Sequence, residues 1–131
     1  MIKTGVNIDF ADAFKLRTRK QAVAIILFLK AIKSNDELYV IKHQLIKSAT
    51  SVAANYRAAC RARSKADFIS KLGIVHEEAD ETVFWIEVLQ DLNYGSIELN
   101  KLLNESEEIL KIVSKSVATS RENMRTLTSK N

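Results

Sequence analysis

The sequence predicts an all-α protein, an up-down-up-down antiparallel four-helix bundle, and three observations carry this prediction. The chain has 131 residues, no proline and only three glycines, which favours a few long helices over many short strands. Apolar residues recur at alternating spacings of three and four, as the buried face of a helix requires. Helix start signals follow one another across short turns, and short connections place successive helices antiparallel.

The first helix is predicted over residues 10–33, after a short tail over residues 1–9. Asp9 or Asp12 can accept hydrogen bonds from the free N–H groups at its start. Its second half is broadly apolar, with Val23, Leu27 and Phe28 on different sides. This pattern indicates burial on more than one side and makes that half a candidate contact with a second subunit.

The second helix is predicted over residues 36–62 and the third over residues 65–92. The first of them follows Ser34-Asn35-Asp36-Glu37, which matches the Ser-x-x-Glu capping box, and Ser64-Lys65-Ala66-Asp67 repeats this start signal with Asp in the fourth place. Ser48 and Asn55 interrupt the apolar face of the second helix. We interpret both as buried, hydrogen-bonded groups that fix the helix register.

The fourth helix is predicted over residues 97–124, after the turn Asn93-Tyr94-Gly95-Ser96. Gly95 tolerates the left-handed backbone that ends a helix, and Ser96 caps the helix that follows. Gly73 lies inside the third helix, where glycine costs about 1 kcal/mol relative to alanine. We therefore predict a tight helix crossing at Gly73.

Length and composition predict one domain over residues 1–131 in a reducing compartment. A chain of this length forms a single core, and Cys60, the one cysteine, has no internal disulfide partner. The longest apolar run is far shorter than the ~20 residues that cross a bilayer, and no secretory signal pattern precedes the first helix. We expect a cytoplasmic protein that does not interact with membranes.

Charge is distributed unevenly along the chain. Residues 1–65 carry 13 Lys and Arg against 4 Asp and Glu, a net charge of +9, while residues 66–131 carry 7 against 12, a net charge of −5. Two interpretations remain open. Either a basic surface binds a polyanion, or two complementary faces meet in an oligomer.

The candidate nucleic-acid contacts lie near the end of the second helix. Arg57, Arg61 and Lys65 are spaced by four and share one side of a helix, with Arg63 at the turn. Cations at a helix C-terminus also complement the helix dipole, by about 0.3–1 kcal/mol each, which explains part of the cluster without a ligand. Few aromatic residues lie nearby, so the pattern favours salt-sensitive binding to the phosphate backbone over sequence-specific reading.

A second basic cluster lies in the first half of the first helix. It contains Lys15, Arg17, Arg19 and Lys20. A charge run of this kind is usually a solvated face. We include Arg17, Arg19 and Lys20 as candidate contacts beside that interpretation.

No catalytic or metal site is predicted. Di-metal bundles need two Glu-x-x-His pairs, but Val40 and Gly73 stand three residues before His43 and His76. The acidic residues of the third helix are interpreted as a solvated or intersubunit face. We also predict no cofactor, because no nucleophile with a base and no phosphate-binding glycine loop can be assembled.

Several segments together carry a family resemblance: residues 37–39, 43–45, 48–56 (SATSVAANY), 63–68 (RSKADF), 72–74, 77–82 (EEADET) and 92–95 (LNYG). They resemble the 23S rRNA intervening-sequence protein family, whose members are often labelled four helix bundle protein. The similarity extends over nearly the whole chain. The commoner family form has an acidic residue and a glycine shortly after Asn55, where this chain reads Arg57-Ala58-Ala59 and so looks like a variant branch.

The resemblance implies a homopentamer. It also implies a distant similarity to the accessory protein of diversity-generating retroelements, which uses a basic pentamer to bind nucleic acid and reverse transcriptase. No catalytic activity carries over, since the matching Ser48, Ser51 and Asn55 have no established chemical role.

The leading hypothesis is a non-enzymatic oligomeric bundle, a ring by resemblance, that presents a basic surface to RNA or DNA and can also bind a partner protein. The alternative is a purely structural or protein-interaction module. In that case the basic half of one subunit docks against the acidic half of its neighbour, and the charges are neutralised internally.

Overall fold

The protein is all-helical over residues 8–129, the part of the chain that the computed structural model describes. Within that range there are four helices and no strand, as predicted. Residues 1–7 of the predicted tail lie outside the described residues, and the first helix already begins at Ile8. The helices are α1 (Ile8–Lys30), α2 (Asp36–Ala59), α3 (Lys65–Asp91) and α4 (Ile97–Ser129).

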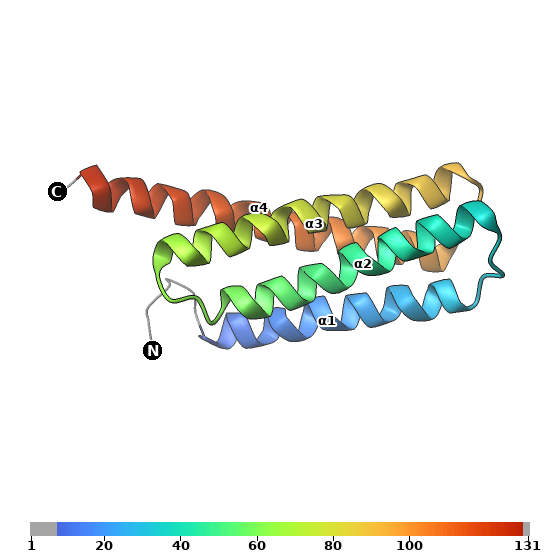
Figure 1. Cartoon of the computed structure of the whole chain (residues 1–131), viewed down its shortest axis with the longest axis horizontal. Coiled ribbons are helices and arrows are strands. Elements are labelled where there is room, and N and C mark those ends of the chain that lie inside the picture. The colour runs from blue at the N-terminus through green and yellow to red at the C-terminus, as the bar shows by residue number, and fades with distance from the viewer. Residues whose placement is uncertain (1–7, 130–131) are drawn as a thin grey trace.

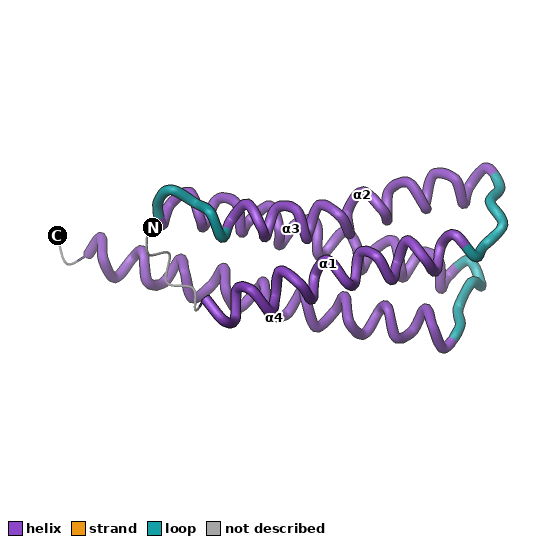
Figure 2. Tube along the Cα trace, turned by 90° about the horizontal axis from the view of Figure 1, so that it is seen from below, coloured by secondary structure: helices purple, strands orange, loops and turns teal. Residues whose placement is uncertain are grey.

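The four helices lie side by side, and the chain turns back at each connection (Figure 1). Each of α1 and α3 packs against both α2 and α4, and the two diagonal pairs do not meet over the described residues. The second view shows the same elongated arrangement, with the α1–α2 and α3–α4 connections at one end and the α2–α3 connection at the other (Figure 2). None of these helices has a stretch long and apolar enough to cross a membrane.

The helix starts are capped largely as the sequence predicts. Ser64 accepts a hydrogen bond from the N–H of Asp67 at 3.0 Å, and Ser96 accepts one from Leu99 at 3.0 Å. At the start of α2 the prediction is wrong by one residue. Asn35, not Ser34, caps this helix, because its side-chain oxygen accepts the Leu38 N–H at 2.9 Å.

The helix ends differ more from the prediction. The left-handed residue after α3 is Asn93, with φ of 68°, and not Gly95; asparagine is among the few residues that tolerate this conformation. The α2 helix ends at Ala59 instead of residue 62, because the next turn tightens to hydrogen bonds between residues three apart. The α1 helix ends at Lys30 instead of residue 33.

The α4 helix runs five residues further than predicted. Val117 is its last buried core residue, yet the helix continues to Ser129. This last part projects beyond the other three helices (Figure 1). We call residues 118–129 the α4 overhang.

The core consists of two apolar clusters. One contains Phe14, Tyr56, Phe68 and Val113, near the α2–α3 connection. The other contains Ile25, Leu38, Leu89 and Leu99, nearer the opposite end. All four helices contribute residues to both clusters.

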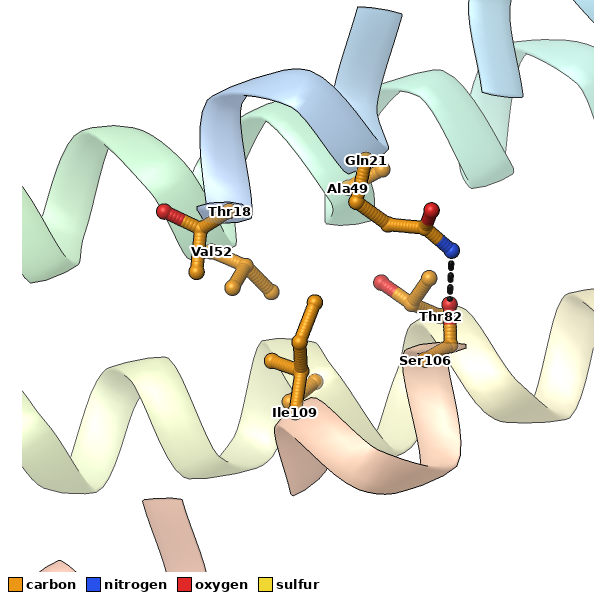
Figure 3. A pocket seen from close by; sticks show the side chains of 8 residues that line it. Thr18, Gln21, Ala49, Val52, Thr82, Ser106 and Ile109 are labelled. Carbon is orange, nitrogen blue, oxygen red and sulfur yellow. Dashed lines mark hydrogen bonds between the residues drawn. The ribbon is translucent and has the colours of Figure 1, made fainter. Parts of the chain in front are cut away.

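Buried polar side chains from all four helices separate the two clusters. Gln21 Nε2 donates to the Leu102 carbonyl at 2.8 Å and to Ser106 Oγ at 2.9 Å, and Thr82 donates to Ser48 Oγ at 3.0 Å. A cavity of about 10 Å³ lies among these groups (Figure 3). We call this the polar layer: Thr18, Gln21, Ser48, Thr82 and Ser106.

Two expectations about packing are wrong. No backbone comes close to Gly73, since a Cβ built there meets no atom within 4 Å. Asn55 is only half-buried, and its amide donates to the carbonyl and hydroxyl oxygens of Ser51 within its own helix. Ser48 is buried and accepts the bond from Thr82 on α3, as a register-fixing residue should.

Candidate nucleic-acid interface

The predicted basic residues at the end of α2 lie on the surface. Arg57, Arg61 and Arg63 are exposed, and Lys65 is half-buried at the first position of α3. None of these four side chains takes part in an ion pair with another described residue. The tight turn after Ala59 keeps Ala62 in the core and leaves Arg61 and Arg63 on either side of it facing solvent.

The carboxylate of Asp67, in the first turn of α3, is already bound. Asp67 accepts a hydrogen bond from Lys71 Nζ at 2.7 Å and another from the Arg63 backbone N–H at 3.2 Å. The bond from Lys71, followed by that from Arg63, lowers the pKa of Asp67 below its ordinary value. Asp67 thus stabilises the α2–α3 turn, and its main cationic partner is Lys71.

The α4 overhang brings two further arginines to the same end of the molecule. Arg121 and Arg125 line a groove together with Ala66 and Ile69 from the start of α3. Arg125 also pairs with Glu122, both of them exposed. We call Arg61, Arg63, Lys65, Arg121 and Arg125 the basic end.

Sequence reasoning missed the two arginines of the overhang. They lie about 60 positions from Arg61 in the sequence, and only the packing of α4 along α3 brings them to this end. The signal that could have found them is topology: in an up-down bundle, the last turn of the fourth helix lies beside the first turn of the third.

The second basic cluster does not behave as one site. Arg17 forms a two-bond ion pair with Glu105 on α4, with N–O distances of 2.8 and 2.7 Å. The hydrogen bond to Glu105 raises the pKa of Arg17. This arginine joins α1 to α4 and is already paired, whereas Arg19 and Lys20 are exposed.

Arg19 and Arg57 border a groove between α1 and α2. Its volume is about 560 Å³. Apolar side chains from both helices line it, and Lys15, Arg19, Arg57 and Asp12 supply its charged lining. Val23 is 50% exposed here, and Leu27, one turn further along α1, is 59% exposed. The apolar second half of α1 is therefore buried on one side only within a single chain.

The outer face of α3 has the opposite charge. Glu77, Asp80 and Glu87 are exposed there, and Phe84 between them is 52% exposed and packs edge-on against Trp85. The uneven charge along the sequence thus corresponds to two different surfaces. The α1–α2 side has apolar and basic residues, and the α3 face has acidic residues and an exposed phenylalanine.

Two further described side chains, His76 and Cys60, are of types that catalytic sites often use. His76 is half-buried and its Nε2 lies 2.9 Å from Ser114 Oγ. Burial raises the pKa of the Cys60 thiol, which keeps it in the unreactive protonated form. Over residues 8–129 no three His, Cys, Asp or Glu side chains come together as a metal site.

Comparison with known families agrees with the bundle and its motifs. The family described as 23S rRNA-intervening sequence protein matches residues 15–115. This chain belongs to that family. The matched range contains the lining of the α1–α2 groove except Asp12 and also contains the first three residues of the basic end, and it stops before the α4 overhang.

A solved structure has the same fold. It is a protein of unknown function from the S23 ribosomal protein family of Bacteroides thetaiotaomicron VPI-5482, whose crystal structure was determined at 1.70 Å resolution. It is 35% identical, with a TM-score of 0.71, and the match covers 79% of this chain and 96% of that one. No functionally curated protein shows significant similarity to the chain. The likeness to the retroelement accessory protein stays a prediction.

Proposed function

We propose that this family member is a non-enzymatic, oligomeric bundle of the cytoplasm that binds RNA or DNA backbones through its basic end. The observation that carries the proposal is the gathering of five cations from the α2–α3 turn, α3 and α4 at one end of the bundle. Four of them have no ion-pair partner among the described residues, and the fifth, Arg125, pairs with an exposed glutamate. Unpaired cations on a folded surface repel one another unless an anion neutralises them.

Binding of this kind is directed at phosphates. The basic end has no aromatic side chain, and arginine and lysine contacts to phosphate oxygens carry no sequence information. Each phosphate that the protein neutralises releases counterions, so binding weakens as the salt concentration rises. For about four phosphate contacts, affinity should fall roughly 10²-fold between about 50 and 200 mM salt. The neighbouring protein surface can at the same time scaffold a partner protein.

Assembly with further copies uses two faces that are not part of the basic end. The α1–α2 groove offers an apolar floor with Lys15, Arg19 and Arg57 at its border, and the α3 face offers Phe84 among carboxylates. The two faces carry opposite charges and both expose apolar side chains, so they are complementary. Contacts between two different faces build rings or filaments, and a pentamer is the form that the family resemblance implies.

The second candidate is a purely structural module. The observation that favours it is this same complementarity of the α1–α2 groove and the α3 face, which would neutralise Arg19 and Arg57 inside the assembly. In that case the five cations of the basic end bind no polyanion.

Electrophoretic mobility shift with generic RNA and DNA, at about 50 and 200 mM salt, separates the candidates. We expect a shift at the lower salt concentration, and we expect the variant Arg61→Gln/Arg63→Gln/Lys65→Gln to weaken binding about 10-fold or more to both polymers. The matched control is Lys30→Gln/Lys33→Gln/Lys101→Gln. It removes three exposed cations from the opposite end and should bind like the unmodified protein.

Two results would contradict the proposal. Absence of a shift at low salt would leave the structural module as the better description. Equal loss of binding in the variant and in the control would show that net charge, and not the basic end, governs the interaction.

A further inference from the structure

The groove between α3 and the α4 overhang differs from the rest of the basic end because it has an apolar floor. It has a volume of about 870 Å³ and is lined by Ala66, Ile69, Ala118, Arg121, Met124, Arg125 and Thr128. We call it the α3–α4 groove. Two arginines therefore stand beside four side chains that offer no hydrogen bond.

The combination of two arginines and an apolar floor distinguishes an unpaired strand from a duplex. A duplex presents phosphates and the edges of its bases, while the apolar faces of the bases are stacked inside it. An unpaired strand exposes those faces to any apolar surface beside its phosphates. The floor formed by Ile69, Met124 and the two alanines can contact base faces but cannot pair with base edges.

The shape of the molecule also favours a single strand at this place. The α4 overhang continues past the last core residue, Val117, and its end projects beyond α3 (Figure 1). It supplies Ala118, Arg121, Met124, Arg125 and Thr128 to one side of the groove. Ala66 on α3 and Ala118 on α4 are exposed and small, so the apolar floor is accessible. Lys65, at the start of α3, extends the cationic border toward the α2–α3 turn.

We infer that the α3–α4 groove binds an unpaired stretch of RNA or DNA, with base faces on Ile69 and Met124 and phosphates on Arg121 and Arg125. This inference rests on the proposed function and gives it a substrate class, single-stranded in preference to duplex nucleic acid. Because the floor has no aromatic ring, the preference is smaller than in proteins that stack bases on aromatic side chains.

The test measures fluorescence anisotropy with labelled single-stranded RNA, single-stranded DNA and a duplex of the same sequence, each of about 20 nucleotides or base pairs. The unmodified protein should bind both single strands about five- to tenfold more tightly than the duplex. The variant Ala66→Leu/Ala118→Leu fills the groove without changing charge. It should lower single-strand affinity to the level of the duplex and leave duplex binding as it was.

A matched variant controls for added apolar surface. Thr119→Leu also adds an apolar side chain to the overhang but at an exposed position that does not line the groove, and it should keep the preference. Arg121→Gln/Arg125→Gln provides a second route, since it should weaken single-strand binding more than duplex binding. Circular dichroism confirms that each variant is folded.

The outcomes separate this inference from the proposed function. Equal affinity for single strands and duplex, unchanged by filling the groove but lost in Arg61→Gln/Arg63→Gln/Lys65→Gln, overturns the inference and keeps the proposed function. Absence of binding to all three probes overturns both. If filling the groove changes the molar mass of the assembly and not nucleic-acid affinity, the groove holds a second copy of the chain, and the inference is wrong.

Discussion

Gly73 lies in the middle of α3 and is half-buried, yet open space surrounds the position of a Cβ on its Cα. Glycine in a helix interior costs about 0.5–1 kcal/mol relative to alanine, because it loses more backbone freedom on folding. We predict that Gly73→Ala stabilises the protein by about that amount, measured by urea unfolding. Gly95→Ala, in the α3–α4 connection and also without a neighbour within 4 Å, is the control and should gain less. A loss of stability at Gly73→Ala would mean that another chain packs against this position.

Capping residues show how precisely local sequence signals locate the boundaries of a helix. Ser64 and Ser96 are predicted and observed as N-caps, since each is the one good cap at its helix start. Ser34 and Asn35 are both good caps, and the choice between them depends on where α2 packs. Asn93 and Gly95 pose the same problem at the end of α3. Local patterns thus locate the capping residue of these helix starts to within one residue, whereas the ends of α1, α2 and α4 differ from the prediction by three to five residues and depend on tertiary packing.

At the scale of single elements, α3 carries a row of carboxylates, and the pKa of one of them, Glu78, is raised. Burial and the negative charges of Glu81 and Glu77 raise the pKa of Glu78, and Lys47 opposes them. A carboxyl whose pKa is higher in the folded than in the unfolded protein makes stability fall as pH rises through that interval. The ionised Glu78 therefore destabilises the folded protein at neutral pH.

We predict that Glu78→Gln is more stable than the unmodified protein at pH 7 and equally stable at about pH 3, where the carboxyl is protonated in both states. The gain should be a few tenths of a kcal/mol, the size of one like-charge pair on a helix. Chemical denaturation at both pH values measures it. Glu107→Gln, exposed on α4, should show no such difference. A variant less stable at pH 7 would show that attraction to Lys47 outweighs burial and repulsion.

The polar layer could be predicted only in part. Ser48 and Ser106 interrupt apolar seams, so periodicity places them inside the bundle. Thr18 and Gln21 stand among the charged residues of α1, and their sequence neighbours give no sign that they are buried. The structure buries them because α1 and α4 join through Gln21 to Leu102 and Ser106 and through Arg17 to Glu105. Such pairs, more than 80 residues apart in the sequence, are not available to reasoning from local spacing.

At the scale of the whole molecule, the fold class was predictable because each helix carries its own periodic signal. The candidate site was not fully predictable, because it is assembled from the α2–α3 turn, α3 and the distant end of α4. Arg61, Arg63 and Lys65 are adjacent in the sequence and were found together, whereas Arg121 and Arg125 reach the basic end only through the length of α4. Conversely, Arg17 looks like part of a basic cluster in the sequence but is paired with Glu105 in the structure.

The two complementary faces lead to the last prediction, which concerns assembly. If the α1–α2 groove of one copy contacts the α3 face of the next, reversing the charges of one face should repel the neighbour. We predict that Arg19→Glu/Arg57→Glu lowers the molar mass measured by light scattering after size-exclusion chromatography. Glu77→Lys/Asp80→Lys should do the same, because like charges then oppose one another at the same contact.

Combining the four substitutions in one chain makes this prediction specific. The combined variant has both faces reversed, so opposite charges meet again and the original mass should return. Simple destabilisation of the bundle would not be repaired in this way, since the two faces lie on different helices of one chain. Hence a combined variant that stays dissociated, or an unmodified protein that is already a monomer, contradicts assembly through these faces. Recovery of the mass with retention of nucleic-acid binding would show that the basic end stays exposed when the copies associate.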